Sequence, residues 1–270
     1  MNIDIKRFTS ALSNTNDLER HLKRLKFLGE NSNDMRVAVF GKFNHGKSTL
    51  LNTIIGEEHF KVADKRETAE ISEYRHNNII WVDTPGLDAD PDGKDDEKAI
   101  KGAFEIADLI FLVHSVKAGE LDQYETQLYH DLIRQNENHD KKIFLILTQT
   151  DQLEKDDFQQ VIATIKKQVP DLVTLSISAS RYIKGVKEGK EIFIEKSGMN
   201  ELFSLIAELP KTFEKLRTQE KSNLLEKIQT ALEQERQELI TNLRELQKQI
   251  TSKHDEFKNA VSEYTLQYSI

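Results

Sequence analysis

The sequence predicts an α/β protein built on a mostly parallel central sheet, with a helix before it and a long helix after it. Three observations carry this prediction. Short β-branched runs alternate with amphipathic segments between Arg36 and about Pro210, as expected of repeated strand–helix units. A glycine-rich pattern follows the first of these runs and leads into a helical segment. Beyond Pro210, about sixty residues contain neither proline nor glycine.

These observations divide the chain into three expected regions. They are an N-terminal helical segment over 1–33, an α/β domain over 34–210 and a long C-terminal helix over 211–270. Within the α/β domain, six runs are expected as strands: RVAVF, EISEYR, IIWV, LIFLVH, KIFLILT and LVTLSIS.

The composition narrows the class of protein. A chain of 270 residues can hold one α/β domain and an appendage. With no cysteine it has neither disulfides nor thiolate metal ligands, which suits a reducing cytosol. A net charge of −8 opposes binding to nucleic acid. Because the N-terminus lacks the apolar stretch of a signal peptide and every apolar run is too short to span a bilayer, we expect a cytoplasmic chain, with peripheral membrane association left open.

The two flanking segments have the pattern of amphipathic helices. Residues 3–30 carry apolar side chains at helical spacing, which predicts an amphipathic helix, either continuous or broken near 13–17. After Pro210, two series of apolar residues recur at intervals of seven: Leu225, Leu232, Leu239 and Leu246, and Leu243, Ile250, Phe257 and Tyr264. Because such a seam needs a partner, we expect a helical bundle or neck with the N-terminal helix; a solitary solvated helix is the alternative. The missing C-terminal capping signal indicates a piece of a longer protein.

The glycine-rich pattern predicts a phosphate-binding loop. Residues 41–48 read GKFNHGKS, which matches G-x-x-x-x-G-K-[ST] between a strand and a helix. In such a loop, backbone N–H groups wrap the phosphates, Lys47 neutralises their oxygens and the Ser48 hydroxyl ligates Mg²⁺. An ordinary strand–helix loop is the alternative. The residues expected to contact the nucleotide here are Gly41, Asn44, His45, Gly46, Lys47, Ser48 and Thr49.

A second motif completes the expected metal site. The run IIWV ends in Asp83-Thr84-Pro85-Gly86, so a carboxylate lies at a strand tip beside the phosphates. We expect Mg²⁺ at Ser48, Thr68 and Asp83, and the Gly86 N–H at the γ-phosphate. Thr68 is chosen because it is the one threonine in the segment 57–70, and a solvated threonine at a strand edge is the alternative there.

The base is expected where the fifth run ends. Thr148, Gln149 and Asp151 follow KIFLIL, and a carboxylate at Asp151 can accept both N–H donors of the guanine edge. Adenine offers no such pair, so the site should disfavour ATP. Gln149 stands where the usual [NT]-K-x-D pattern has lysine. The base site therefore lacks the positive charge of that lysine. Ser178 and Ala179, after the last run, are expected near the guanine oxygen.

With these motifs in order, residues 34–210 resemble the translation-factor-related GTPases and, within them, the bacterial dynamin-like proteins. The strings GKFNHGKSTLLNTIIG and DTPGLD carry the resemblance. It implies a GTPase with GTP or GDP as ligand, a neck formed by the flanking helices, nucleotide-dependent pairing of two G domains, and membrane remodelling.

The resemblance also raises the question of what stabilises charge in the transition state, since Leu87 stands where Ras-like proteins carry a water-orienting glutamine. The implied answer is Asn44 holding a K⁺ ion between the phosphates, in a site completed by a second G domain. Arg66 or Lys65 is the alternative charge. The residues assigned catalytic roles are thus Asn44, Lys47, Thr68 and Gly86, whereas His45, His59 and His114 are expected to be incidental, without the spacing of a metal centre.

Two other functions remain open from the sequence. One is an Era-like regulatory or ribosome-assembly GTPase, although the acidic, Glu/Gln-rich C-terminal helix is unlike a basic RNA-binding module. The other is a scaffold that holds GTP without hydrolysing it.

Overall fold

The protein is described from a computed structural model that covers residues 15–30, 34–60, 71–84, 105–136 and 141–268. Contacts divide the described residues into two compact units. One spans Phe27–Lys221, and the other combines the chain up to Lys26 with the chain from Ser222. The domain boundaries expected at 33/34 and 210/211 stay a prediction.

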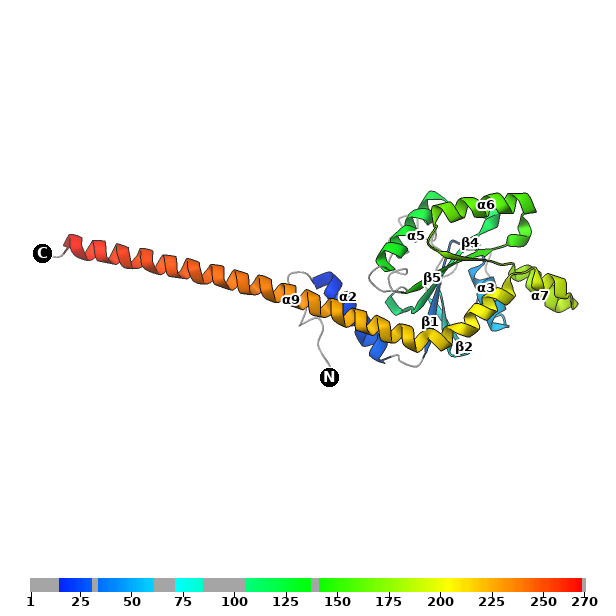
Figure 1. The fold of residues 1–270 in the computed structure, drawn as a ribbon, viewed down its shortest axis with the longest axis horizontal. Helices are drawn as coiled ribbons and strands as arrows, with labels where there is room; N and C mark the ends of the chain where they lie inside the picture. The colour runs from blue at the N-terminus through cyan, green and yellow to red at the C-terminus, as the bar shows by residue number, and fades with distance from the viewer. Residues whose placement is uncertain (1–14, 31–33, 61–70, 85–104, 137–140, 269–270) are drawn as a thin grey trace. The chain divides into compact units, whose positions relative to one another are not determined.

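The larger unit contains one six-stranded sheet in the order β2-β3-β1-β4-β5-β6 (Figure 1). All neighbouring strands are parallel except β2, which pairs antiparallel with β3. The strands are β1 (Met35–Phe40), β2 (Ser72–His76), β3 (Ile79–Asp83), β4 (Leu109–Ser115), β5 (Lys142–Thr148) and β6 (Val173–Ser176). Each coincides with one of the runs expected from the sequence, so the mostly parallel α/β fold is confirmed.

Helices cover both faces of this sheet. The helices of the larger unit are α3 (Lys47–Ile55), α5 (Gln123–Asn136), α6 (Lys155–Gln168), α7 (Ala179–Glu188), α8 (Glu191–Glu195) and the first part of α9 (Met199–Tyr268), with short 3₁₀ turns η1 (Val116–Ala118) and η2 (Thr150–Gln152). One core cluster joins the sheet to α3 and to α9, through side chains such as Leu50 and Leu202. The second joins it to α5 and α6, through Leu132 and Ile165. The strand β4 is buried at every position because both layers cover it.

The antiparallel edge of the sheet is a tight hairpin. Asn77 and Asn78 connect β2 to β3 and both have positive φ angles, of 49° and 62°. Two left-handed residues give the turn whose twist matches a hairpin, and asparagine tolerates this conformation better than most residues. The hairpin brings β3, with Asp83 at its end, beside β1.

The helix α9 begins earlier than the sequence indicated. It starts at Met199 and passes through Pro210, whereas a long helix was expected only after that residue. Proline inside a helix removes one backbone hydrogen bond. Here Leu209 and Phe213 are both buried in the core of the larger unit, and this packing holds the helix on either side of the proline.

The smaller unit combines α2 (Thr15–Glu30), as far as Lys26, with the later part of α9. Leu18, Leu224 and Ile228 are buried. Leu225, the first residue of the expected seam, is 49% exposed, so the seam stays a prediction.

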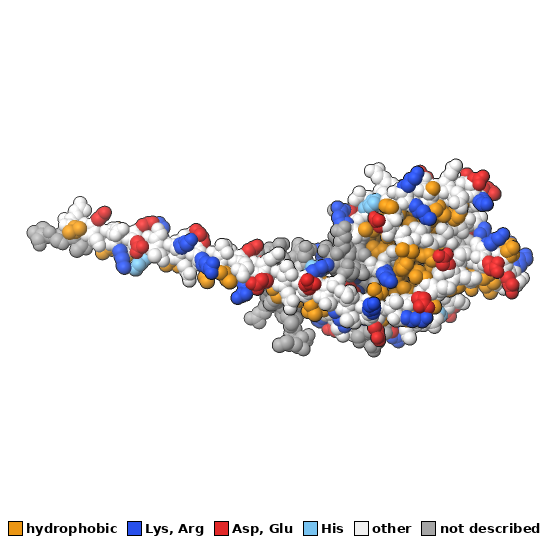
Figure 2. Space-filling model, viewed as in Figure 1, with side chains coloured by type: hydrophobic (Ala, Val, Ile, Leu, Met, Phe, Trp, Pro, Cys, Tyr) orange, Lys and Arg blue, Asp and Glu red, His pale blue; other side chains and the backbone are white. Residues whose placement is uncertain are grey.

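Further along α9, apolar and charged side chains alternate on the surface (Figure 2). Exposed apolar residues there include Leu239, Leu243, Leu246, Ile250 and Phe257. Among the described residues, no helix is both long and apolar enough to cross a membrane.

Candidate functional site

The candidate site lies at the edge of the sheet where the parallel strands end. This is the edge at which open α/β sheets bind ligands. The loop after β1 passes directly over β4: a Cβ on Gly41 would lie 2.2 Å from the Val113 carbonyl oxygen, so only glycine fits. Asn44 and Gly46 have φ angles of 59° and 84°, which turn the loop back before α3 begins at Lys47. The sequence-predicted loop is therefore formed, with Thr49 in the first turn of α3.

Lys47 folds back into this loop. Its ammonium group donates hydrogen bonds to the carbonyl oxygens of Gly41, at 2.8 Å, and Lys42, at 3.0 Å. The side chain is buried. A buried ammonium at the N-terminus of a helix makes a site that favours phosphate, because the charge and the helix dipole act in the same direction.

Ser48 and Asp83 form a set of oxygen donors beside Lys47. The Ser48 hydroxyl donates to Asp83 Oδ2 at 3.1 Å. Among the described residues, Asp83 Oδ1 is a buried oxygen with no hydrogen-bond partner. Burial raises the pKa of Asp83, against the opposing effects of Lys47 and Ser48. A buried carboxylate oxygen without a donor suits a hard divalent cation such as Mg²⁺, so these two residues fit the ion.

The segment after Asp83 is held to β1 at its start. Thr84 donates to the Val39 carbonyl oxygen through its hydroxyl, at 2.8 Å, and its backbone N–H points to the same oxygen. Thr68, Gly86 and Leu87, together with Lys65 and Arg66, lie outside the described residues. Their expected roles stay predictions.

The end of β5 is tied to the phosphate-binding loop by side chains. Thr148 is buried and its hydroxyl donates to the His45 carbonyl oxygen at 2.6 Å. The Gln149 amide donates to the Asn44 carbonyl oxygen at 3.0 Å and accepts from the Ser115 hydroxyl at 2.8 Å. Gln149 therefore links two parts of the site without the charge that a lysine would bring.

Asp151 is held in place by hydroxyl groups. Its Oδ1 accepts from Ser178 at 2.5 Å, and its Oδ2 accepts from Ser180 at 3.0 Å and from Gln152 at 2.9 Å. Burial acts to raise the pKa of Asp151, but these hydrogen bonds outweigh it and lower the pKa. The carboxylate is thus kept ionised and oriented, as an acceptor of two N–H donors must be.

Ser178 and Ala179 complete this side of the site. Ser178 caps α7 by accepting from the Arg181 N–H at 3.0 Å, and Ala179 is the first residue of that helix. The structure therefore brings the Ser178 hydroxyl to Asp151, a contact that the sequence did not indicate. The Ser180 hydroxyl also reaches Asp151, and this side-chain contact was likewise not indicated by the sequence.

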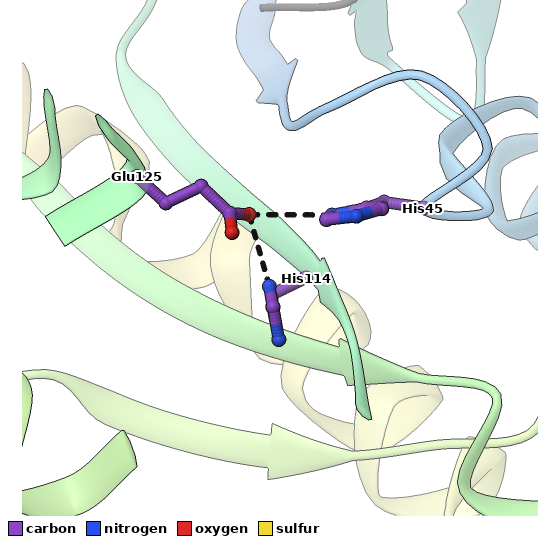
Figure 3. A group of neighbouring side chains, drawn as sticks. All are labelled: His45, His114 and Glu125. Carbon is purple, nitrogen blue, oxygen red and sulfur yellow. Dashed lines mark hydrogen bonds and ion pairs between the residues drawn. The ribbon is translucent and has the colours of Figure 1, made fainter. Parts of the chain in front are cut away.

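Three residues that the sequence did not group lie together behind the phosphate-binding loop: His45, His114 and Glu125 (Figure 3). All three are buried. His45 and His114 were set aside because they have no spacing partner in the sequence, yet in the structure both lie beside Glu125. No spacing rule could have found the cluster, because its members come from the loop, the end of β4 and the first turn of α5. His59 lies outside it, against Phe60 and Tyr74.

Parts of this chain are similar in sequence to known proteins. Residues 36–149 match the model of a family described as 50S ribosome-binding GTPase. An uncharacterized protein of Acinetobacter baylyi is 38% identical over 232 residues, which cover 84% of this chain and 55% of that protein. The GTPase Era of Lactobacillus delbrueckii subsp. bulgaricus is 28% identical over 134 residues, which cover 47% of this chain and 42% of Era.

The fold is similar to that of a solved bacterial dynamin. That structure is of an oligomerised bacterial dynamin pair, for which long-range sensing and tethering of membranes is described. The match has a TM-score of 0.55 at 20% identity, and covers 97% of this chain and 50% of the other. This chain thus spans about half the length of the relatives that it matches. From the fold, the loop and these matches, we conclude that the chain has the P-loop GTPase fold, in a form similar to that of a bacterial dynamin.

Proposed function

We propose that this chain binds GTP with Mg²⁺ and hydrolyses it to GDP and phosphate. We further propose that it couples pairing of two G domains to rearrangement of its helical neck, as a dynamin-like GTPase. The observation that carries the proposal is the convergence of three groups on one edge of the sheet. These are the Lys47 ammonium, the Ser48–Asp83 oxygens and the hydroxyl-bound Asp151 carboxylate.

Each group matches one part of the nucleotide. Lys47 would exchange its two backbone carbonyl partners for phosphate oxygens, which are stronger acceptors because they are charged. Asp83 and the Ser48 hydroxyl would hold Mg²⁺, which neutralises charge on the phosphates. Asp151 would accept hydrogen bonds from the guanine ring. A bound base removes water from this carboxylate, and only a base with two N–H donors would compensate for that loss.

The hydrolytic step needs positive charge at the γ-phosphate beyond that of Lys47. Asn44 supports our proposal of a K⁺ ion there, because its side chain is exposed at the tip of the loop. Gln149 donates a hydrogen bond to the Asn44 carbonyl oxygen and so holds the Asn44 backbone. The amide oxygen of the Asn44 side chain would therefore be presented from a defined place. In this proposal, a second G domain closes over the site and completes the coordination of the ion.

Membrane remodelling is the proposed use of this cycle, supported by the fold shared with a dynamin pair that senses and tethers membranes. The alternative is a ribosome-assembly factor, supported by the matches to Era and to a family of ribosome-binding GTPases. Flotation of the chain with anionic liposomes and cosedimentation with 50S ribosomal subunits separate the two. Flotation without cosedimentation supports the membrane role, and the reverse supports the ribosomal one.

Nucleotide binding is tested by calorimetry with GDP and excess Mg²⁺. We expect Lys47→Ala to weaken GDP binding about 10- to 100-fold, the equivalent of one charge-assisted hydrogen bond. Lys155→Ala, at an exposed lysine on α6, should leave binding unchanged. The same affinity in wild type and Lys47→Ala would refute the phosphate site.

Base selection is tested separately. Asp151→Asn should reduce the preference for GDP over ADP, whereas Asp156→Asn on the surface of α6 should preserve it. If the folded wild-type chain takes up no guanine nucleotide, the proposed function is wrong.

Hydrolysis is tested by single-turnover assays and by turnover at increasing protein concentration in K⁺ and in Na⁺. The scaffold alternative predicts no phosphate release in a single turnover. Our proposal predicts a rate per molecule that rises with concentration and is higher in K⁺. A rate that is indifferent to both would eliminate the paired, K⁺-assisted mechanism.

A further inference from the structure

The cluster of His45, His114 and Glu125 has the composition and spacing of a transition-metal site. Glu125 Oε1 lies 2.9 Å from His114 Nδ1 and 3.3 Å from His45 Nδ1. The ligand atoms of all three residues lie within 4.8 Å of one another. Donors bound tetrahedrally to one Zn²⁺ lie about 3.3 Å apart, given bonds of roughly 2.0–2.1 Å. The two distances to Glu125 are therefore close to those of a formed site.

One nitrogen of the cluster makes no hydrogen bond. Among the described residues, His45 Nδ1 is a buried nitrogen with no hydrogen bond, and it faces the Glu125 carboxylate. A buried polar atom in this state is unfavourable unless something binds it. Figure 3 shows the Glu125 carboxylate pointing at both imidazole rings.

His114 is oriented as metal-binding histidines usually are. Its Nε2 donates to the Gly119 carbonyl oxygen at 2.9 Å, which leaves Nδ1 to face the cluster. A hydrogen bond from the far ring nitrogen to a carbonyl fixes the tautomer and the ring plane of a ligating histidine. His114 is fully buried, so this orientation is rigid.

Glu125 supplies the negative charge. Its carboxylate is buried and lies against both imidazole rings. The nearby Lys42 ammonium is paired with Asp122 and lies 3.9 Å from Oε2, the oxygen that points away from the histidine contacts.

We propose that His45, His114 and Glu125 form a binding site for a Zn²⁺-class divalent ion, distinct from the Mg²⁺ site at Ser48 and Asp83. Two imidazole nitrogens and one carboxylate oxygen suit Zn²⁺, whereas Mg²⁺ takes oxygen donors. Because His45 belongs to the phosphate-binding loop, the ion would tie this loop to β4 and α5.

The alternative is a metal-free cluster of two imidazoles around one carboxylate. His114 and Glu125 are buried together in the metal-bound cluster and in the metal-free cluster alike. The two possibilities differ in whether the wild-type chain takes up an ion, and in whether uptake depends on these side chains.

The experiment uses the full chain after chelator treatment, without nucleotide and with excess Mg²⁺ to occupy the oxygen site. Zn²⁺ uptake is measured by calorimetry, and Co²⁺ is used as a coloured probe whose absorption is intense only in tetrahedral sites. The variants are His114→Gln and Glu125→Gln. The matched control is His130→Gln, which removes an exposed imidazole from the same helix as Glu125.

We expect one Zn²⁺ per wild-type chain and per His130→Gln chain, with an intense Co²⁺ spectrum for both. In His114→Gln and Glu125→Gln, affinity should fall at least about 10- to 100-fold, since even the outer hydrogen-bond partners of metal ligands are worth that much. Circular dichroism checks that each variant folds, and a folded variant of either residue suffices.

Thermal unfolding of the wild-type chain gives a readout that needs no variant. An ion that binds only the folded chain raises the melting temperature in proportion to the logarithm of its concentration. Wild-type protein that shows neither this rise nor a tetrahedral Co²⁺ spectrum would overturn the proposal. Equal Zn²⁺ affinity in wild type and folded His114→Gln would do the same.

Discussion

At the scale of single residues, Gly41 shows how closely the phosphate-binding loop is fitted to the strand beside it. The carbonyl oxygen of Val113 occupies the space that a side chain would need. Backbone cannot move as a flexible side chain can, so any larger residue must displace either the loop or β4. The loop and the central strand of the sheet are therefore positioned together.

We expect Gly41→Ala to lower the free energy of unfolding by about 1–3 kcal/mol, the usual effect of overpacking. Gly29→Ala is the matched control, because nothing lies within 4 Å of its added Cβ and its φ is not positive. Gly29 lies in α2, and replacing a helical glycine with alanine should instead stabilise the chain by roughly 0.5–1 kcal/mol. Urea denaturation measures both, and equal stability of the two variants would contradict the close fit at Gly41.

Asp83 illustrates a conflict between stability and function at one carboxyl group. Burial raises its pKa, so the folded chain favours the neutral form more than the unfolded chain does. A carboxyl group of this kind contributes stability below its unfolded pKa, and that contribution is lost as the pH rises through the folded pKa. At neutral pH the ionised group therefore destabilises the chain, and the proposed Mg²⁺ would offset this effect.

We expect Asp83→Asn to be more stable than wild type at neutral pH without Mg²⁺ or nucleotide. The difference should disappear in acid below the ordinary pKa of aspartate, where the wild-type group is also neutral. With Mg²⁺ and GDP present, the order should reverse, because only wild type gains stability from the ligand. Urea midpoints under the three conditions test this, and a variant less stable than wild type without ligand would contradict it.

At the scale of elements, α9 is attached to the sheet by a buried ion pair. Arg217 donates to both oxygens of Asp108, at 3.1 and 2.9 Å, and to the Asp34 carbonyl oxygen at 3.0 Å. Its guanidinium group lies 4.4 Å from the centre of the Phe213 ring. Asp108 also accepts from the Arg36 N–H at 2.8 Å, so the pair connects α9 to the start of β1.

Removing one partner of this ion pair should strongly lower the stability of the folded chain. We expect Arg217→Met to lower the free energy of unfolding by about 3–5 kcal/mol, because a buried carboxylate is left without its cation. The control is Arg236→Met on the same helix, whose exposed pair with Glu233 should contribute little to stability, because solvent screens it. Chemical denaturation of both variants is the measurement, and similar stabilities would show that the buried pair does not hold the helix.

At the scale of the whole molecule, the nucleotide is proposed to control association between chains. We expect light scattering to give the mass of a monomer with GDP and of a dimer with a γ-phosphate mimic. The physical reason is that the extra phosphate offers charge for a second G domain to share, at a loop where Asn44 is exposed. The same mass in both states would count against pairing driven by the nucleotide.

The order of the amino acids was enough to predict the fold class and the centre of the site. Six β-branched runs became the six strands, because strand formation depends on local side-chain pattern and burial. The phosphate-binding loop was equally predictable, since Gly41, Lys47 and Ser48 are neighbours in the chain and need no distant residue to bring them together. Asp83 and Asp151 followed because parallel strands end at a common edge.

Other features depend on contacts between distant segments, and only the folded structure shows them. It extended α9 back through Pro210, because core packing on both sides outweighs one lost hydrogen bond. It buried Leu224 rather than Leu225, because the covered face of a helix depends on what packs against it. It brought His45 to Glu125 across 80 positions of sequence, a distance over which no local spacing predicts a contact. Local pattern thus settled which elements form, and only packing settled which side chains meet.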